Sequence, residues 1–477
     1  MNTLSSRNLF NLMLLLVTSV ALASCGSSDD TQLVYYDDTA ITAFSVGTLK
    51  QLVETTDDDG NATTTYQNLD CSGYKFYIDQ MNHLIYNVDS LPVGVDPTRV
   101  VCSISSKSGG YLQIKDLESA EYTFFNASDS LDFSTARYFR VIASSGNSYA
   151  DYQVKVNVHQ EEADEFVWRN KITTNATLGG LTNTRAFALN NNIYLFGVSG
   201  GQCKIYRTAE TDGKNWAKLT ANIAAMLTDQ TPFNIVVKDG QFYLYSQGTL
   251  YTSADAVSWQ TAATASIGRL IGASSSNLYA YSNDGTLLRS SDNGQSWTDD
   301  EMDNSKDLLP SQDISFICRL LRAYASSNQL LIVGNRDVSG DKTAQVWGKV
   351  EQNDDNAQQQ PWSYYPMTSD VRNKAPHLTN LQAISYGENI IALGGQAMNA
   401  SDLKTFANFY KSEDEGVTWP VEENITFPEG FSCSPLHFAL VVDSQNYIWV
   451  ICGNSGQIWK GRRNSLGWQT YEKYITE

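Results

Sequence analysis

Apolar and polar residues alternate with a period of two through much of the second half of the chain. An apolar run, a short polar turn and a second apolar run together predict a β-hairpin. This pattern predicts six hairpins, which begin at Phe187, Ile235, Leu270, Ala323, Ala383 and Leu440. A third strand and then a tryptophan follow each hairpin, at Trp216, Trp259, Trp297, Trp362, Trp419 and Trp468.

The spacing of these units sets the architecture of residues 166–477. Repeats of roughly 40–60 residues with about four strands each are typical of the blades of a β-propeller. One blade cannot cover its own faces, so neighbouring blades must stack and the ring must close. We therefore predict six blades. Trp168 precedes the first hairpin and belongs either to an outer strand that closes the ring or to a seventh blade.

Residues 33–160 predict a separate β domain. Short alternating runs are separated by turn residues, such as Asp59-Gly60, which is typical of an antiparallel sandwich. We interpret Asp59-Gly60 as a hairpin turn and not as part of a calcium loop, because Tyr66 occupies the position of the expected Glu ligand. The closing run Phe139–Val158 is similar to the end of bacterial surface Ig-like domains. Residues 161–165 form a charged linker, and the whole chain is predicted to be all-β.

The first 25 residues have the pattern of a signal that directs export of the protein. Arg7 and the apolar run Leu12–Val20 are typical of a signal peptide. The string Leu22-Ala23-Ser24-Cys25 resembles a bacterial lipobox, which implies removal of residues 1–24, lipidation of Cys25 and anchoring to the outer membrane. Residues 25–32 would be a tether. Its Asp29-Asp30 resembles a surface-export signal of Bacteroides-like bacteria, while a plain flexible tether on the periplasmic face is the alternative.

The amino-acid composition restricts the classes of partner and the kinds of chemical site that we predict. A net charge of −19 repels nucleic acid, so we predict none as a partner. The cysteines form no C-x-x-C pair and the four histidines lie far apart, so we predict no metal, no cofactor and no catalytic residues. Cys71 with Cys102 and Cys433 with Cys452 are either disulfides or buried thiols. Thr39, in Asp38-Thr39-Ala40, resembles an O-glycosylation acceptor of the same bacteria.

Two octapeptides, Ser290–Trp297 and Ser412–Trp419, share the pattern S-x-D-x-G-x-(S/T)-W. Both resemble the Asp-box, or bacterial neuraminidase repeat. Each residue type has a structural role: glycine for a tight turn, aspartate as acceptor for amides and hydroxyls, and tryptophan for packing. We therefore assign structural and not catalytic roles to Ser290, Asp292, Gly294, Ser296, Trp297, Ser412, Asp414, Gly416, Thr418 and Trp419.

The chain as a whole resembles a family of Bacteroides-type surface lipoproteins of unknown function, most strongly over Phe76–Asp96. Sialidases also carry Asp-boxes, but their Arg-Ile-Pro signature is absent here and Arg169, Arg185 and Arg207 are scattered in sequence. We therefore predict a monomeric, non-catalytic module that binds a glycan or a surface protein through propeller loops. A structural component docking an outer-membrane complex is the alternative, and a glycoside hydrolase is less favoured.

Candidate ligand contacts follow from the longest spacings between tryptophans. Loop insertions are predicted at 300–313, 336–361 and 394–405. Trp362, Tyr364 and Tyr365 lie at the end of the second insertion. Aromatic side chains of this kind stack on sugars, although packing within an outer strand is the competing interpretation.

Overall fold

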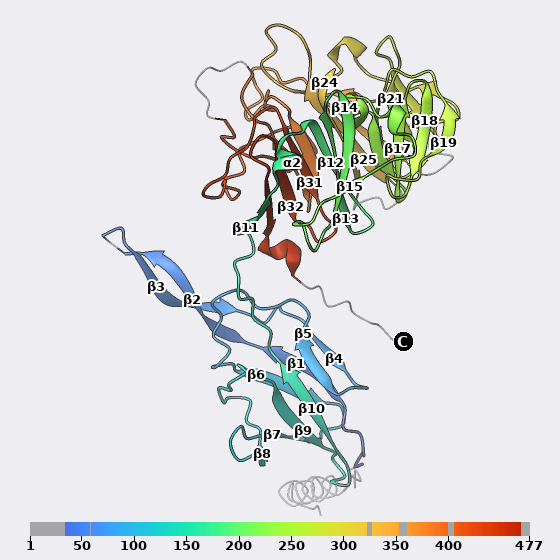
Figure 1. Cartoon of the computed structure of the whole chain (residues 1–477). Coiled ribbons are helices and arrows are strands. Elements are labelled where there is room, and N and C mark those ends of the chain that lie inside the picture. The colour runs from blue at the N-terminus through green and yellow to red at the C-terminus, as the bar shows by residue number, and fades with distance from the viewer. Residues whose placement is uncertain (1–33, 58, 322–326, 353–359, 399–404, 469–477) are drawn as a thin grey trace, which may run out of the picture. The chain divides into compact units, whose positions relative to one another are not determined.

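A computed structural model describes residues 34–57, 59–321, 327–352, 360–398 and 405–468 (Figure 1). The predicted signal peptide, Cys25 and the tether as far as residue 32 lie outside the described residues. The chain divides into two compact units between Gln160 and Glu161. Within the described part of the chain, no helix is long and apolar enough to cross a membrane.

The first unit is built from three sheets. A six-stranded sheet has the order β4-β5-β10-β9-β7-β8, and β1-β6 and β2-β3 form two-stranded sheets. The bounds are β1 Ile41–Val46, β2 Thr48–Thr56, β3 Ala62–Asp70, β4 Phe76–Asp79, β5 Leu84–Asn87, β6 Cys102–Ser106, β7 Tyr111–Lys115, β8 Tyr122–Phe124, β9 Arg137–Ile142 and β10 Tyr149–Lys155. Strands β5 and β10 pair in parallel. The expectation of a purely antiparallel domain is therefore wrong at this pair.

The predicted turn at Asp59-Gly60 joins β2 and β3. Gly60 has a φ of +85°, and its amide donates to the Asp57 carbonyl oxygen at 3.0 Å. The Asp57 carboxylate accepts hydrogen bonds from the amides of Asp59 and Asn61 at 3.0 and 2.8 Å. These amide donors hold the pKa of Asp57 below its usual range. The carboxylate thus stabilises the turn itself, and the hairpin interpretation is confirmed.

The second unit contains six sheets among its described residues. Four follow the chain in the orders β12-β13-β14-β15, β16-β17-β18-β19, β20-β21-β22-β23 and β24-β25-β26-β27, and the fifth is β28-β29-β30. The sixth has the order β11-β33-β32-β31. Their bounds are β11 Phe166–Thr174, β12 Thr182–Leu189, β13 Asn192–Ser199, β14 Gln202–Ala209, β15 Ala217–Leu219, β16 Ile235–Lys238, β17 Gln241–Ser246, β18 Thr249–Ser253, β19 Gln260–Thr264, β20 Arg269–Ala273, β21 Leu278–Tyr281, β22 Leu287–Ser290, β23 Thr298–Asp299, β24 Gln312–Leu320, β25 Ser327–Asn335, β26 Gln345–Gln352, β27 Ser363–Tyr364, β28 Gln382–Tyr386, β29 Asn389–Leu393, β30 Tyr410–Ser412, β31 Phe438–Val442, β32 Ile448–Cys452 and β33 Gln457–Arg463.

Helical segments in this unit are short. They are the α-helical turn α2 Ala176–Gly179 and the 3-10 turns η1 Ala224–Met226, η2 Thr231–Phe233, η3 Lys306–Leu308 and η4 Asn464–Gly467. The Asn175 side chain caps α2 by accepting from the amides of Thr177 and Leu178. Both α2 and η2 lie directly before the first strand of a sheet, so they help to place the starts of β12 and β16.

Apolar clusters between consecutive sheets close these sheets into a ring. Residues of β12–β14 pack with β16 and β17, and equivalent clusters join the second sheet to the third and so on to the sixth. A further cluster joins Ala439, Val441 and Trp449 of the sixth sheet to Ile193 and Leu195 of the first. Both faces of each sheet are thus covered by its neighbours, which is the arrangement of a β-propeller.

Strand β11 settles the position of Trp168. It pairs with β33 in an antiparallel register, with Trp168 opposite Gly461. The first strand of the unit and the last strands of the chain therefore share one sheet. This is the ring-closing alternative of the two that the sequence left open.

Two predictions in the fourth sheet are wrong. The first strand of its hairpin is β24 and ends at Leu320, upstream of the predicted start at Ala323, and residues 322–326 lie outside the described residues. The segment 336–361, predicted as a loop insertion, contains the central strand β26. Lys349 and Glu351 of this strand are buried, so a strand with a polar sequence pattern was mispredicted as a loop. The other five predicted hairpins are confirmed.

All six cysteines in the described residues are free thiols. Burial raises the pKa of Cys102 and of Cys203 to about 12, which keeps both protonated and unreactive at neutral pH. Cys433 and Cys452 belong to the same apolar cluster. The amide of Ser434 donates to the carbonyl oxygen of Gly453 at 3.2 Å, so the two cysteine-bearing segments run side by side.

Candidate binding site at the mouth of the propeller channel

The first strands of the six sheets surround a cavity of about 340 Å³ at the centre of the ring. Strands β12, β16, β20, β24, β28 and β31 all contribute to its wall. Apolar side chains such as Val237, Ile314 and Ile384 line much of it. This size lies at the lower end of the range for small-molecule pockets, and pockets of this kind combine apolar walls with a few polar groups.

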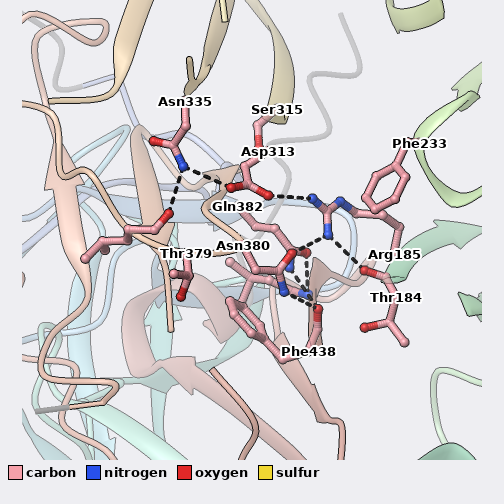
Figure 2. Close-up of polar contacts among 12 residues, drawn as sticks. Thr184, Arg185, Phe233, Asp313, Ser315, Asn335, Thr379, Asn380, Gln382 and Phe438 are labelled. Carbon is pink, nitrogen blue, oxygen red and sulfur yellow. Dashed lines mark hydrogen bonds and ion pairs between the residues drawn. The ribbon is translucent and has the colours of Figure 1, made fainter. Parts of the chain in front are cut away.

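Polar side chains gather where these first strands begin (Figure 2). Arg185 from β12 lies beside Asp313 from β24 and Asn380 from the segment before β28, and dashed lines join its guanidinium to both. Nη1 of Arg185 donates to Asn380 Oδ1 at 2.7 Å and to the Thr184 carbonyl oxygen at 2.9 Å. One guanidinium nitrogen is thereby held by two fixed acceptors.

The other side of the Arg185 guanidinium has few partners. Nη2 is buried and makes no hydrogen bond, and Asp313 Oδ1 lies 4.0 Å away, beyond hydrogen-bond distance. Burial, with the nearby charge of Arg269, lowers the pKa of Arg185 to about 10, and Asp313 only partly offsets this. The group stays charged at neutral pH but is under-solvated and incompletely paired, and such a cation favours an additional anionic partner.

Arg269 of β20 supplies a second guanidinium at the same place. The guanidinium carbons of Arg185 and Arg269 lie 5.0 and 5.7 Å from the ring centroid of Phe233. Arg269 Nε donates to the Phe233 carbonyl oxygen and Nη1 to the Ser311 carbonyl oxygen, each at 3.1 Å. Phe233 ends η2, so this short turn positions both cations against one ring.

Unusual backbone geometry accompanies the polar group. Asn183, Asp313 and Asn380 have φ values of +49°, +51° and +51°. A positive φ is uncommon outside glycine, and Asn and Asp tolerate it best. The registers of β12 with β13 and of β24 with β25 shift around Asn183 and Asp313. Bulges re-aim side chains and are frequent at binding sites, and the first strands β12 and β24 both carry one near their starts.

Amide side chains fix the loops around the two arginines. Asn335 Nδ2 donates to Asp313 Oδ2 at 2.9 Å and to the Leu378 carbonyl oxygen at 2.8 Å. The side-chain amides of Asn380 and Gln382 both donate to the Phe438 carbonyl oxygen, at 3.1 and 2.9 Å (Figure 2). Side-chain hydrogen bonds thus link the fourth, fifth and sixth sheets at the mouth.

The two octapeptides lie away from the channel and form the same turn. Asp292 accepts from the hydroxyl of Ser290 and from the amide and hydroxyl of Ser296, and Gly294 has a φ of +90°. Asp414 makes the equivalent contacts with Ser412 and Thr418, and Gly416 has a φ of +93°. The hydrogen bonds from Ser296 hold the pKa of Asp292 down at about 2. A carboxylate used in this way stabilises its own turn.

The three aromatic residues proposed as sugar contacts occupy packing positions. Trp362 is fully buried, and its Nε1 donates to Asp300 Oδ2 at 2.7 Å. The Tyr364 hydroxyl donates to Gln345 Oε1 at 2.7 Å, and Tyr365 packs against the cluster between the fourth and fifth sheets. Trp362 therefore presents no face to a ligand in this structure, and we place the candidate site at the channel mouth instead.

Few features of the sequence indicated that Arg185 and Arg269 lie together. Arg185 was one of three scattered arginines, and the other two lie elsewhere: Arg169 bonds the Tyr447 hydroxyl and Arg207 lies on β14. Arg269 directly precedes the predicted third hairpin, and Arg185 lies two residues before the predicted first hairpin. An arginine just before two of the predicted hairpins was the available signal.

No group of three or more His, Cys, Asp or Glu side chains in the described part of the chain is arranged to hold a metal ion. The described groups at the mouth are two guanidinium groups, one carboxylate, amides and one aromatic ring. Such a set binds and orients an anion.

Family models match both units of the chain. Residues 162–471 match the DUF6242 beta propeller domain, and residues 44–156 match the DUF6242 N-terminal domain, a domain of unknown function. The chain belongs to the DUF6242 family. The family description confirms the predicted propeller and a domain of unknown function. No curated protein matches the chain.

Several solved structures are similar to this DUF6242 member at low sequence identity. A family AA12 carbohydrate-active enzyme of Trichoderma reesei is 10% identical with a TM-score of 0.38, over 63% of this chain and 96% of its own. PorZ, a surface component of the type-IX secretion system of Porphyromonas gingivalis, is 12% identical with a TM-score of 0.35, over 87% of this chain and 63% of its own. A thermostable family-43 glycoside hydrolase is 10% identical with a TM-score of 0.29, over 59% of this chain and 88% of its own.

Proposed function

We propose that this chain is a non-catalytic binding module that recognises a glycan at the mouth of its propeller channel. One observation carries the proposal: a cavity of about 340 Å³, lined by all six first strands, has two partly buried arginines at its mouth. One of them keeps a buried nitrogen without a hydrogen-bond partner. Each of the six sheets is one blade in this proposal, and the two octapeptides are Asp-box turns that support the blades.

The location of the protein in the cell is part of the same proposal. The lipobox-like string at Cys25 supports a lipid anchor in the outer membrane, with the Ig-like first unit and the propeller displayed on the cell surface. The mass of the N-terminal peptide of the native protein tests this point. We expect a lipidated Cys25 at the N-terminus, and a chain that retains residues 1–24 or an unmodified Cys25 would contradict this proposal.

A steric block of the channel tests the binding site. Ala273 lines the cavity and is half-buried, so Ala273→Trp would fill part of the channel. Ala217, on the outer strand β15, is exposed, so Ala217→Trp is the matched control. We expect the full-length chain in a mild non-ionic detergent to bind one class on a polysaccharide array. Ala273→Trp should reduce this binding at least tenfold while Ala217→Trp leaves it unchanged.

Three results would replace this function with another. Release of reducing sugar from a bound polysaccharide would make the chain a glycoside hydrolase. Failure to bind any glycan, together with co-purification of an outer-membrane protein, would favour the structural docking role. Equal glycan binding by Ala273→Trp and Ala217→Trp would move the site away from the channel.

A further inference from the structure

The channel mouth carries charged groups that a neutral ligand would leave without an ionic partner. Arg185 and Arg269 bring two positive charges to one ring, and Asp313 supplies one negative charge. Asp313 is also held by Asn335, and its distance of 4.0 Å from Arg185 leaves Nη2 without a hydrogen bond. Among these three groups the balance is therefore one uncompensated positive charge.

We propose that this mouth binds the single carboxylate of a sugar acid, through Arg185 and Arg269. The inference rests on the proposed function and adds the chemical class of the ligand. A guanidinium presents its N–H groups in a planar fork that matches the two oxygens of a carboxylate. An excess of one positive charge suits a monoanion better than a dianionic phosphate, which would leave a buried charge unpaired.

The cavity beneath the two arginines favours a sugar over a peptide. Its volume of about 340 Å³ accommodates one compact group, whereas a peptide segment would need an extended groove. Ser315 lines the cavity, and its Oγ accepts from the Ala383 amide at 2.9 Å. Its hydroxyl proton can be donated to a hydroxyl of the ligand. The chain carries a net charge of −19, so attraction for an anion is local to this mouth.

A pair of matched ligands isolates the carboxylate. Galacturonate and its methyl ester share the same sugar ring, but only the acid carries a charge, and that charge is a single carboxylate. Isothermal titration of the full-length chain in detergent should show binding of galacturonate or of glucuronate, and much weaker binding of the ester. Loss of a hydrogen bond to a charged group corresponds to roughly a ten- to hundredfold loss of affinity.

Protein variants then assign the contact. Arg185→Gln and Arg269→Gln should each weaken binding of the acid by that ten- to hundredfold factor and leave binding of the ester unchanged. Arg185→Lys should recover only part of the affinity, because lysine keeps the charge and loses the fork. Arg207→Gln, on β14, is the control of identical chemistry outside the cavity. The melting temperature of each variant checks that the propeller is folded.

The outcomes separate this inference from the proposed function. If acid and ester bind equally and Ala273→Trp removes both, the channel is a glycan site and the carboxylate inference is overturned. If a short acidic peptide binds in an Arg185-dependent manner and no sugar acid does, the ligand class is wrong. If inorganic phosphate or sulfate binds more tightly than galacturonate does, the monoanion argument fails. Failure of every uronate to bind overturns the inference, and failure of all glycans overturns the proposed function as well.

Discussion

Asp300→Asn should lower the free energy of unfolding of the propeller by about 3–5 kcal/mol, because it breaks a buried ion pair from one side. Lys349 Nζ lies 2.7 and 2.8 Å from the two Asp300 oxygens, and the lysine side chain is 1% exposed. Trp362 Nε1 donates to the same carboxylate at 2.7 Å. The substitution preserves shape but leaves the lysine charge buried without its counter-ion. Asp300 follows β23 and Lys349 lies on β26, so the pair joins the third and fourth sheets.

Tryptophan fluorescence during urea unfolding measures this loss in the propeller alone. All ten tryptophans of the chain lie at residue 168 or later, so the first unit contributes no signal. Asp284→Asn is the matched control, since it removes the partner of Lys306 in an exposed ion pair and should change stability far less. Adding Lys349→Met to Asp300→Asn should restore part of the loss. Equal effects of Asp300→Asn and Asp284→Asn would contradict the account.

Trp419→Ala should also cost about 3–5 kcal/mol, the range for deleting a large buried aromatic side chain. Trp419 is 1% exposed and packs in the cluster between the fourth and fifth sheets. Its Nε1 donates to the Gly416 carbonyl oxygen at 2.9 Å. The truncation would open a cavity between two sheets and remove a hydrogen bond within the turn.

The second octapeptide supplies the control for this prediction. Trp297 occupies the same position in its motif but is only half-buried, and its Nε1 makes no hydrogen bond. Trp297→Ala should therefore cost clearly less than Trp419→Ala when both are compared by urea unfolding. A larger loss for Trp297→Ala would show that the turn, and not burial between sheets, determines the contribution of the tryptophan.

Local sequence patterns were sufficient to predict most of the hairpins that form the ring of sheets. Period-two alternation with polar turns located five of the six hairpins, because their strands bury apolar side chains between neighbouring sheets. The turn residues were equally informative: Asn190 and Asn191, with φ values of +49° and +59°, form the turn of the first hairpin.

Strand β26 shows why the fourth sheet was mispredicted. Its sequence, Gln345–Gln352, contains charged residues at positions that a buried strand rarely tolerates. Lys349 is neutralised by Asp300, and Glu351 accepts from Ser274, Asn277 and Asn328. These partners come from distant parts of the chain. A polar pattern with buried, distant partners cannot be distinguished from a loop by local alternation.

The candidate site was missed for a related reason. Arg185 and Arg269 are separated by a whole sheet in sequence, and only the ring brings both to Phe233. Of the three aromatic residues that looked suitable for sugar stacking, Trp362 is fully buried and Tyr364 and Tyr365 are half-buried. Residue type alone therefore did not indicate which side chains lie together, whereas the position of each arginine on a first strand is visible only once the ring is formed.

The position of a bound glycan shows directly whether the channel mouth is the binding site. A crystal structure of the chain in complex with the polysaccharide fragment that it binds best would show where the ligand lies. We expect a sugar ring in the channel mouth, with its polar groups on Arg185 and Arg269. A glycan bound on the outer strands of the ring or on the first unit, with the mouth empty, would contradict it.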